Sequence, residues 1–68
     1  MSWRVELTAI GGIRFGNLAL DTLIEGVYDS REDAERIARD VIGKPRSYSV
    51  HSGTRVGMVV SAFVEGEP

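Results

Sequence analysis

The 68-residue chain has no cysteine, so a disulfide framework and a thiolate metal site are both excluded. Its one histidine, His51, has no cluster of acidic residues near it in the sequence, so we expect no bound metal and no cofactor. No apolar run approaches the roughly 18 residues of a membrane span. The first ten residues carry Arg4 and Glu6 inside their apolar stretch, unlike a secretory signal. We therefore expect a cytoplasmic protein without membrane contact.

Positive charge is also scarce. Eight Lys and Arg residues against ten Asp and Glu residues give a net charge of -2, the wrong sign for a protein that covers a phosphate backbone. The 43% hydrophobic content argues against disorder. Arginine far outnumbers lysine, which is typical of high-GC genomes such as those of actinobacteria and their phages. An accessory regulator from such a source fits this composition.

The size of the chain bears on its stability. A domain of about 60 residues buries only about 60% of the surface of its unfolded chain, and such domains usually need a disulfide, a metal or a partner. With the first two excluded, we expect association with another chain. We expect a single α+β domain over residues 1–64, followed by a polar tail at 65–68.

The first half of this domain is predicted to contain two strands, over residues 2–10 and 17–28. Hydrophobic residues alternate along both, as in strands with one buried face. Gly26 indicates a bulge. A turn at residues 11–12 would pair Trp3 with Leu20, whereas a turn at 16–17 would pair Val5 with Tyr28. In both registers the inward residues are the same: Trp3, Val5, Leu7 and Ala9 from the first strand, and Leu18, Leu20, Thr22 and Ile24 from the second.

A helix follows. Ser30 or Asp29 is a suitable N-cap, acidic residues fill the first turn, and Gly43 is a typical C-terminal stop. One apolar stripe at helical spacing is predicted to face the sheet: Ala34, Ile37, Ala38, Val41 and Ile42.

Two more strands are predicted after the helix, over residues 46–51 and 55–64. A three-residue loop at 52–54 would pair Val50 with Val56 and Tyr48 with Met58. The element order is β-β-α-β-β. We therefore expect an α+β fold in which one helix packs on one face of a four-stranded antiparallel sheet.

No residue pattern predicts catalysis. The acidic residues of the helix lie on its polar face, where ion pairs with arginine are the usual arrangement. His51 lies near Ser49 but lacks an orienting group and an oxyanion donor. The glycines at 11, 12 and 16 precede a strand, whereas a dinucleotide-binding loop precedes a helix. We expect a protein that is not an enzyme and has no small-molecule substrate.

One basic segment suggests an alternative function. Residues 44–55 contain Lys44, Arg46 and Arg55 without any acidic residue, and Tyr48 lies among them. Basic residues interleaved with an aromatic can bind a nucleic-acid backbone and stack on a base. The alternative is a nucleic-acid-binding accessory domain that uses these three cations, although the acidic balance of the chain makes nucleic acid the less favoured partner.

Residues 27–36, VYDSREDAER, form a strand followed by a capped helix. This stretch resembles the strand-to-helix junction of the arm-type DNA-binding domains of phage integrases, and also that of peptidoglycan-binding SPOR domains. The resemblance covers about ten of the 68 residues. The integrase-type domain binds DNA with basic strands before its helix, whereas here Arg4 and Arg14 are offset by Glu6, Asp21 and Glu25. No functional residue is therefore transferred and no family is assigned.

The last predicted strand is apolar on both faces. Val56, Met58, Val60, Ala62 and Val64 are predicted to face the helix. The opposite face, which one helix cannot cover, would then form an apolar patch, and such patches usually mark an interaction surface. A second copy is the favoured occupant, giving a homodimer; the alternatives are one different protein partner, or the loop at 11–17 folded back over the patch. The predicted interaction residues are Ile10, Leu23, Val27, Val59 and Phe63.

Overall fold

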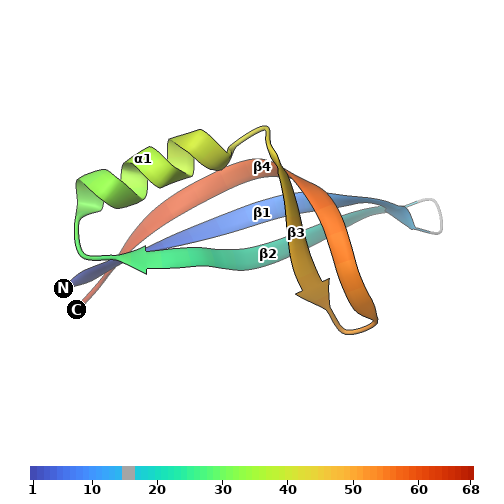
Figure 1. Cartoon of the computed structure of the whole chain (residues 1–68), viewed down its shortest axis with the longest axis horizontal. Coiled ribbons are helices and arrows are strands. Elements are labelled where there is room, and N and C mark those ends of the chain that lie inside the picture. Colours follow the sequence, from blue (N-terminus) through green and yellow to red (C-terminus); the bar gives the residue numbers. More distant parts are fainter. Residues whose placement is uncertain (15–16) are drawn as a thin grey trace.

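A computed structural model, which describes residues 1–14 and 17–68, contains four antiparallel strands and one helix (Figure 1). The strand order in the sheet is β2-β1-β4-β3, and the helix packs against one face. The predicted α+β fold with β-β-α-β-β order is confirmed. The elements are β1 (Ser2–Arg14), β2 (Asn17–Tyr28), α1 (Arg31–Val41), β3 (Pro45–Val50) and β4 (Gly53–Glu67).

Helix α1 begins and ends as the sequence predicts. The Ser30 side-chain oxygen accepts a hydrogen bond from the backbone N–H of Asp33 at 3.3 Å. After the helix, Gly43 has a φ of 81°, a left-handed conformation that favours glycine. Ile42, predicted to face the sheet, is instead 48% exposed, because it is the C-cap and its backbone is already extended.

The core lies between α1 and the face of the sheet that we call the concave face. It is built around alternate residues of β1, with two alanines on the helix that allow close packing. Trp3, Leu23, Tyr28 and Val64 pack around its margin. The buried hydrophobic residues are Val5, Leu7, Ala9, Ala34, Ala38 and Val59.

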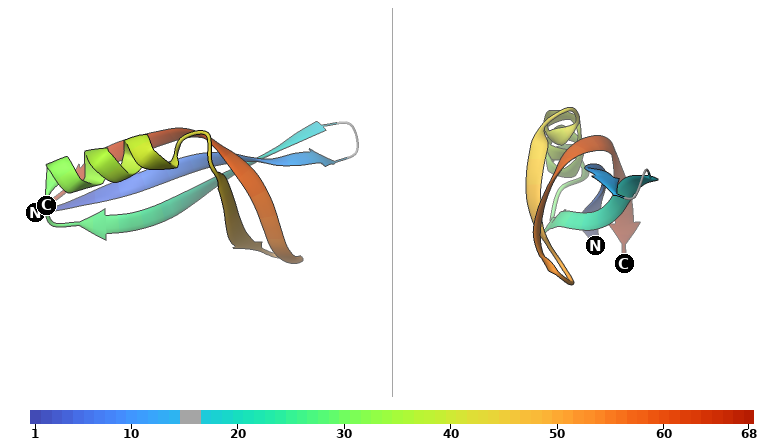
Figure 2. Two further views of the ribbon diagram at one scale, coloured as in Figure 1. Left: turned by 45° about the horizontal axis from the view of Figure 1, so that its top comes forward. Right: turned by 90° about the vertical axis from the view of Figure 1, so that its right-hand side faces the viewer.

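The helix covers only part of the concave face. Beyond its end, the β3–β4 hairpin bends out of the plane of β1 and β2 (Figure 2). The Tyr48 side chain of this hairpin lies against the backbone of Gly11 and Gly57. A Cβ atom at Gly57 would come within 2.9 Å of the Tyr48 hydroxyl and 3.0 Å of the Ile10 carbonyl oxygen. Glycine at these two positions therefore lets the hairpin close over the sheet.

The observed β1–β2 pairing differs from both predicted registers. Trp3 pairs with Tyr28, and Val5 pairs with Gly26. Both strands continue until Arg14 pairs with Asn17, so the connection is at residues 15–16, outside the described residues. The backbone of residues 11–14 therefore extends a two-stranded ribbon past the last pair with β4. This differs from the alternative in which the loop at 11–17 folds back over the patch.

The β3–β4 connection is also tighter than predicted. Val50 pairs with Gly53 and Tyr48 with Arg55, so the turn contains only His51 and Ser52. Gly53, the first residue after the turn, has a φ of 140°, which side chains rarely adopt.

Both ends of the chain lie in neighbouring strands. A polar tail was predicted at residues 65–68. Instead, β4 continues to Glu67, so only Pro68 lies beyond the last strand. Glu67 pairs with Ser2, so the two termini lie side by side (Figure 1).

The position of Tyr48 predicts the effect of filling the space at Gly57. We expect Gly57→Ala to lower the free energy of unfolding by about 1–3 kcal/mol, because the added methyl group would overlap the Tyr48 ring and a backbone oxygen. Urea denaturation at one fixed protein concentration measures this change. Ser49→Ala, at an exposed site on β3, is the control and should change stability by less than about 0.5 kcal/mol. Equal stability of the two variants would show that Tyr48 does not pack on Gly57.

Candidate interaction surface

A β-bulge in β4 determines which of its residues are buried. Thr8 pairs with Ser61 and Ala9 with Val59, which leaves Val60 as the extra residue. The bulge reverses the alternation, so residues before it face opposite to the prediction. Val59, predicted on the interaction face, is 2% exposed and belongs to the core. Val56, Met58 and Val60, predicted to face the helix, are exposed instead.

A second bulge has the same effect in β2. Val5 pairs with Gly26 and Glu6 with Ile24, so Glu25 is the extra residue. The bulge predicted at Gly26 is thus confirmed, but its effect on the residues before it was not anticipated. Leu23, predicted on the interaction face, packs against the core. Leu20 and Ile24, predicted to be inward, are 62% and 51% exposed.

Together the two bulges collect apolar side chains on the sheet face opposite α1, which we call the convex face. Of the predicted interaction residues, Val27 and Phe63 are exposed there, and Ile10 is half-buried between Leu20 and Met58. A folded domain rarely leaves so many large apolar side chains together in water. We define the convex patch as Leu20, Ile24, Val27, Val56, Met58, Val60 and Phe63, together with the half-buried Ile10.

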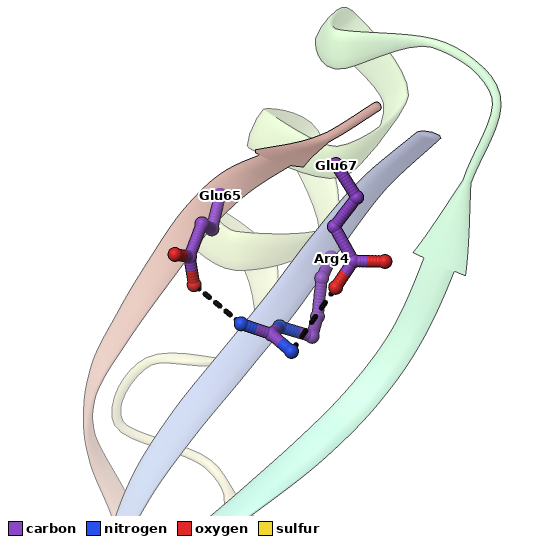
Figure 3. A network of polar contacts seen from close by, with 3 residues as sticks. All are labelled: Arg4, Glu65 and Glu67. Atoms are coloured by element: carbon purple, nitrogen blue, oxygen red, sulfur yellow. Dashed lines mark hydrogen bonds and ion pairs between the residues drawn. The ribbon is translucent and has the colours of Figure 1, made fainter. Parts of the chain in front are cut away.

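Charged side chains border this patch at one end. Arg4 of β1 forms ion pairs with Glu65 at 2.5 Å and Glu67 at 3.0 Å, on the side of the sheet away from α1 (Figure 3). The hydrogen bond to Glu65 is the main cause that raises the pKa of Arg4. Glu6, two residues further along β1, lies between Ile24 and Phe63. We call these four residues the acidic end.

A separate polar cluster occupies the part of the concave face that α1 leaves uncovered. The Tyr48 hydroxyl donates a hydrogen bond to Asp21 at 2.5 Å, and Arg55 donates to the same carboxylate oxygen at 2.8 Å. Nearby, Arg46 forms an ion pair with Glu25 at 2.5 Å. Tyr48 and Arg46 lie on β3 and Arg55 on β4, so these contacts join the β3–β4 hairpin to β2, the edge strand on the opposite side of the sheet. They fasten the bent hairpin to the far edge of the sheet.

This cluster bears on the nucleic-acid alternative. Arg46 and Arg55 are turned toward carboxylates of β2, and the Arg55 side chain is only 14% exposed. Lys44 lies just before β3 and is exposed. The three predicted cations therefore do not form one surface, and the geometry does not favour this alternative.

Other kinds of site find no support in the described residues. Within them, no group of His, Asp and Glu side chains is placed to hold a metal ion, and no pocket opens. In the same part of the chain, no helix combines the length and apolarity needed to cross a bilayer. Comparison with known proteins gives no matching family model, no similar curated protein and no similar solved structure.

Sequence reasoning missed five members of the convex patch: Leu20, Ile24, Val56, Met58 and Val60. Each precedes or occupies a bulge, where strict alternation fails. In β4 the sequence did contain a signal for the bulge. The three consecutive apolar residues at 58–60 fit a bulge as well as they fit a strand covered on both faces.

The polar cluster predicts a stability change in alkaline solution. Burial is the main cause that raises the pKa of Tyr48, and its hydrogen bond to Asp21 adds to this effect. Because the folded pKa exceeds the unfolded value of about 10, the contribution of Tyr48 is complete below pH 10 and declines as pH rises through the folded pKa. Urea midpoints between pH 9 and pH 11.5 measure the decline.

The matched variants are Tyr48→Phe and Tyr28→Phe. We expect the first to reduce the alkaline decline and the second to retain it, since the shift belongs to Tyr48. An unchanged decline in Tyr48→Phe would contradict the assignment.

Proposed function

We propose that this chain is a non-enzymatic protein-interaction module that acts through its convex patch, with a second copy of itself as the partner. The observation that carries this proposal is the set of seven exposed, large apolar side chains on the sheet face opposite the helix. Covering them would place a second layer against the sheet, as in a β-sandwich.

The exposed surface supports the proposal. The chain exposes 4651 Å². A compact monomer of its mass, 7.4 kDa, exposes about 4200 Å². The difference is about half of the roughly 800 Å² that each partner buries in a stable interface. The chain thus has more surface than a monomer of this size needs.

The small core favours a second copy as the partner. Among the residues whose burial the structure describes, three of the six buried hydrophobic residues are alanines, which contribute little buried area. A homodimer would give every copy the same additional apolar layer, so stability would not depend on a different protein. The proposal also places the protein in the cytoplasm as an accessory regulator, which rests on its cysteine-free composition and its balance of arginine over lysine.

Light scattering tests the proposal directly. We expect a mass about twice 7.4 kDa for the wild-type chain. Met58→Glu should give a folded monomer, because a carboxylate would be buried at the centre of the interface in both copies. Its dissociation constant should rise at least about a hundredfold, in line with two buried charges.

The control is Ser52→Glu, which adds the same charge in the β3–β4 turn and should leave the dimer intact. Circular dichroism shows that each variant is folded. A wild-type chain that is monomeric at all concentrations up to 1 mM (roughly the weakest affinity of interest) would overturn the proposal.

A further inference from the structure

The convex patch has two chemically different ends. At one end, Ile10 lies between Leu20 and Met58, with Val56 and Val60 nearby on β4. Among the residues whose side chains the structure describes, no charged residue of β1, β2 or β4 lies on the convex face at this end. We call it the apolar end.

The opposite end carries the charges. Glu6 lies between the apolar side chains of Ile24 and Phe63, and the ion-paired Arg4 and Glu65 form the next row. With Glu67, this end has three carboxylates and one guanidinium. The middle row, between the two ends, consists of hydroxyl side chains: Thr8, Thr22 and Ser61.

This segregation restricts how two copies can pack. If like ends met, the acidic ends of both copies would be brought together and dehydrated, which is unfavourable for charges of one sign. If the copies run in opposite directions and overlap at their apolar ends, the two acidic ends lie far apart. A two-fold axis across the strands gives this arrangement and sets each strand against its own copy.

We propose that the second copy packs antiparallel on the convex patch, with the two-fold axis crossing the Ile10–Met58 row. This inference rests on the proposed function and adds the arrangement of the partner. Met58 of one copy then lies opposite Met58 of the other. Phe63 pairs with Glu6, four residues from Ile10 along β1, or about 14 Å at 3.4 Å per residue. The two copies of Phe63 therefore lie about 27 Å apart along the strands.

Single cysteine substitutions can distinguish this arrangement from one in which like ends meet, because the natural chain contains no cysteine. We compare Met58→Cys with Phe63→Cys, two exposed positions on the same strand and the same face. Each variant is treated with a short bismaleimide crosslinker at a concentration where light scattering shows a dimer. We expect Met58→Cys to give mostly covalent dimer and Phe63→Cys to give at least tenfold less.

The remaining outcomes are informative. Crosslinking at Phe63, or at neither position while the dimer persists, would overturn the antiparallel arrangement and leave the proposed homodimer standing. A monomeric wild-type chain would instead remove the proposed function, and this inference with it. The two failures are therefore distinguishable.

A charge-removing variant gives an independent measurement. Glu6→Gln should change the dimer dissociation constant less than about threefold, because the two copies of Glu6, like those of Phe63, lie about 27 Å apart along the strands. If like ends met, the same substitution would strengthen the dimer at least about tenfold by removing two facing carboxylates, and that result would overturn the inference. Salt should accordingly have little effect on the wild-type dimer, since the acidic ends are far apart relative to a Debye length of about 8 Å.

Discussion

One constraint shapes the whole domain: a single eleven-residue helix must cover a four-stranded sheet. The helix is long enough to bury the half of the concave face that contains Val5 and Leu7. The other half is covered by the sheet itself, whose β3–β4 hairpin bends back across it. Hydrogen bonds from Tyr48 and Arg55 to Asp21 then join the β3–β4 hairpin to the opposite edge strand, β2. The fold therefore has an apolar half held by a helix and a polar half held by its own hairpin.

Covering the concave face in this way leaves the convex face without any second layer. The two bulges intensify the effect, because each turns apolar residues outward that simple alternation would place inside. The bulge at Val60 exposes Met58, and the bulge at Glu25 exposes Ile24. The core and the convex patch thus share a single cause, since the shift that buries Val59 also exposes its neighbours.

Local signals in the sequence were sufficient for the helix and the element order. Ser30 and Gly43 predicted the helix ends because capping depends on a few adjacent residues. The face of the sheet on which each residue before a bulge lies could not be predicted from such local signals. Strand register depends on pairing between segments far apart in the chain, so Leu23 and Val59 were placed on the wrong face. For the same reason, the contacts of Arg46 and Arg55 with β2 became visible only in three dimensions.

Aromatic side chains laid over glycine recur in this domain. Tyr48 covers Gly11 and Gly57, and Trp3 lies so close to Gly66 that a Cβ there would be 2.8 Å from the ring. On the Trp3 ring lies Arg31, with its guanidinium carbon 5.4 Å from the ring centre, a distance suited to a cation–π contact. Glycine in a strand lacks a side chain that can pack, and the neighbouring aromatic replaces the missing contact. At Gly11 and Gly57 the close contact with Tyr48 also lets the β3–β4 hairpin approach the sheet.

The side-by-side position of the two termini has a consequence for the chain as a building unit. Because Ser2 and Glu67 are paired neighbours, a short linker could join the ends without disturbing a strand, and new ends could be opened at the tight His51–Ser52 turn. The same closeness means that the domain could be inserted into a surface loop of a host protein, entering and leaving at a single point. The convex patch would then lie on the surface of the host protein.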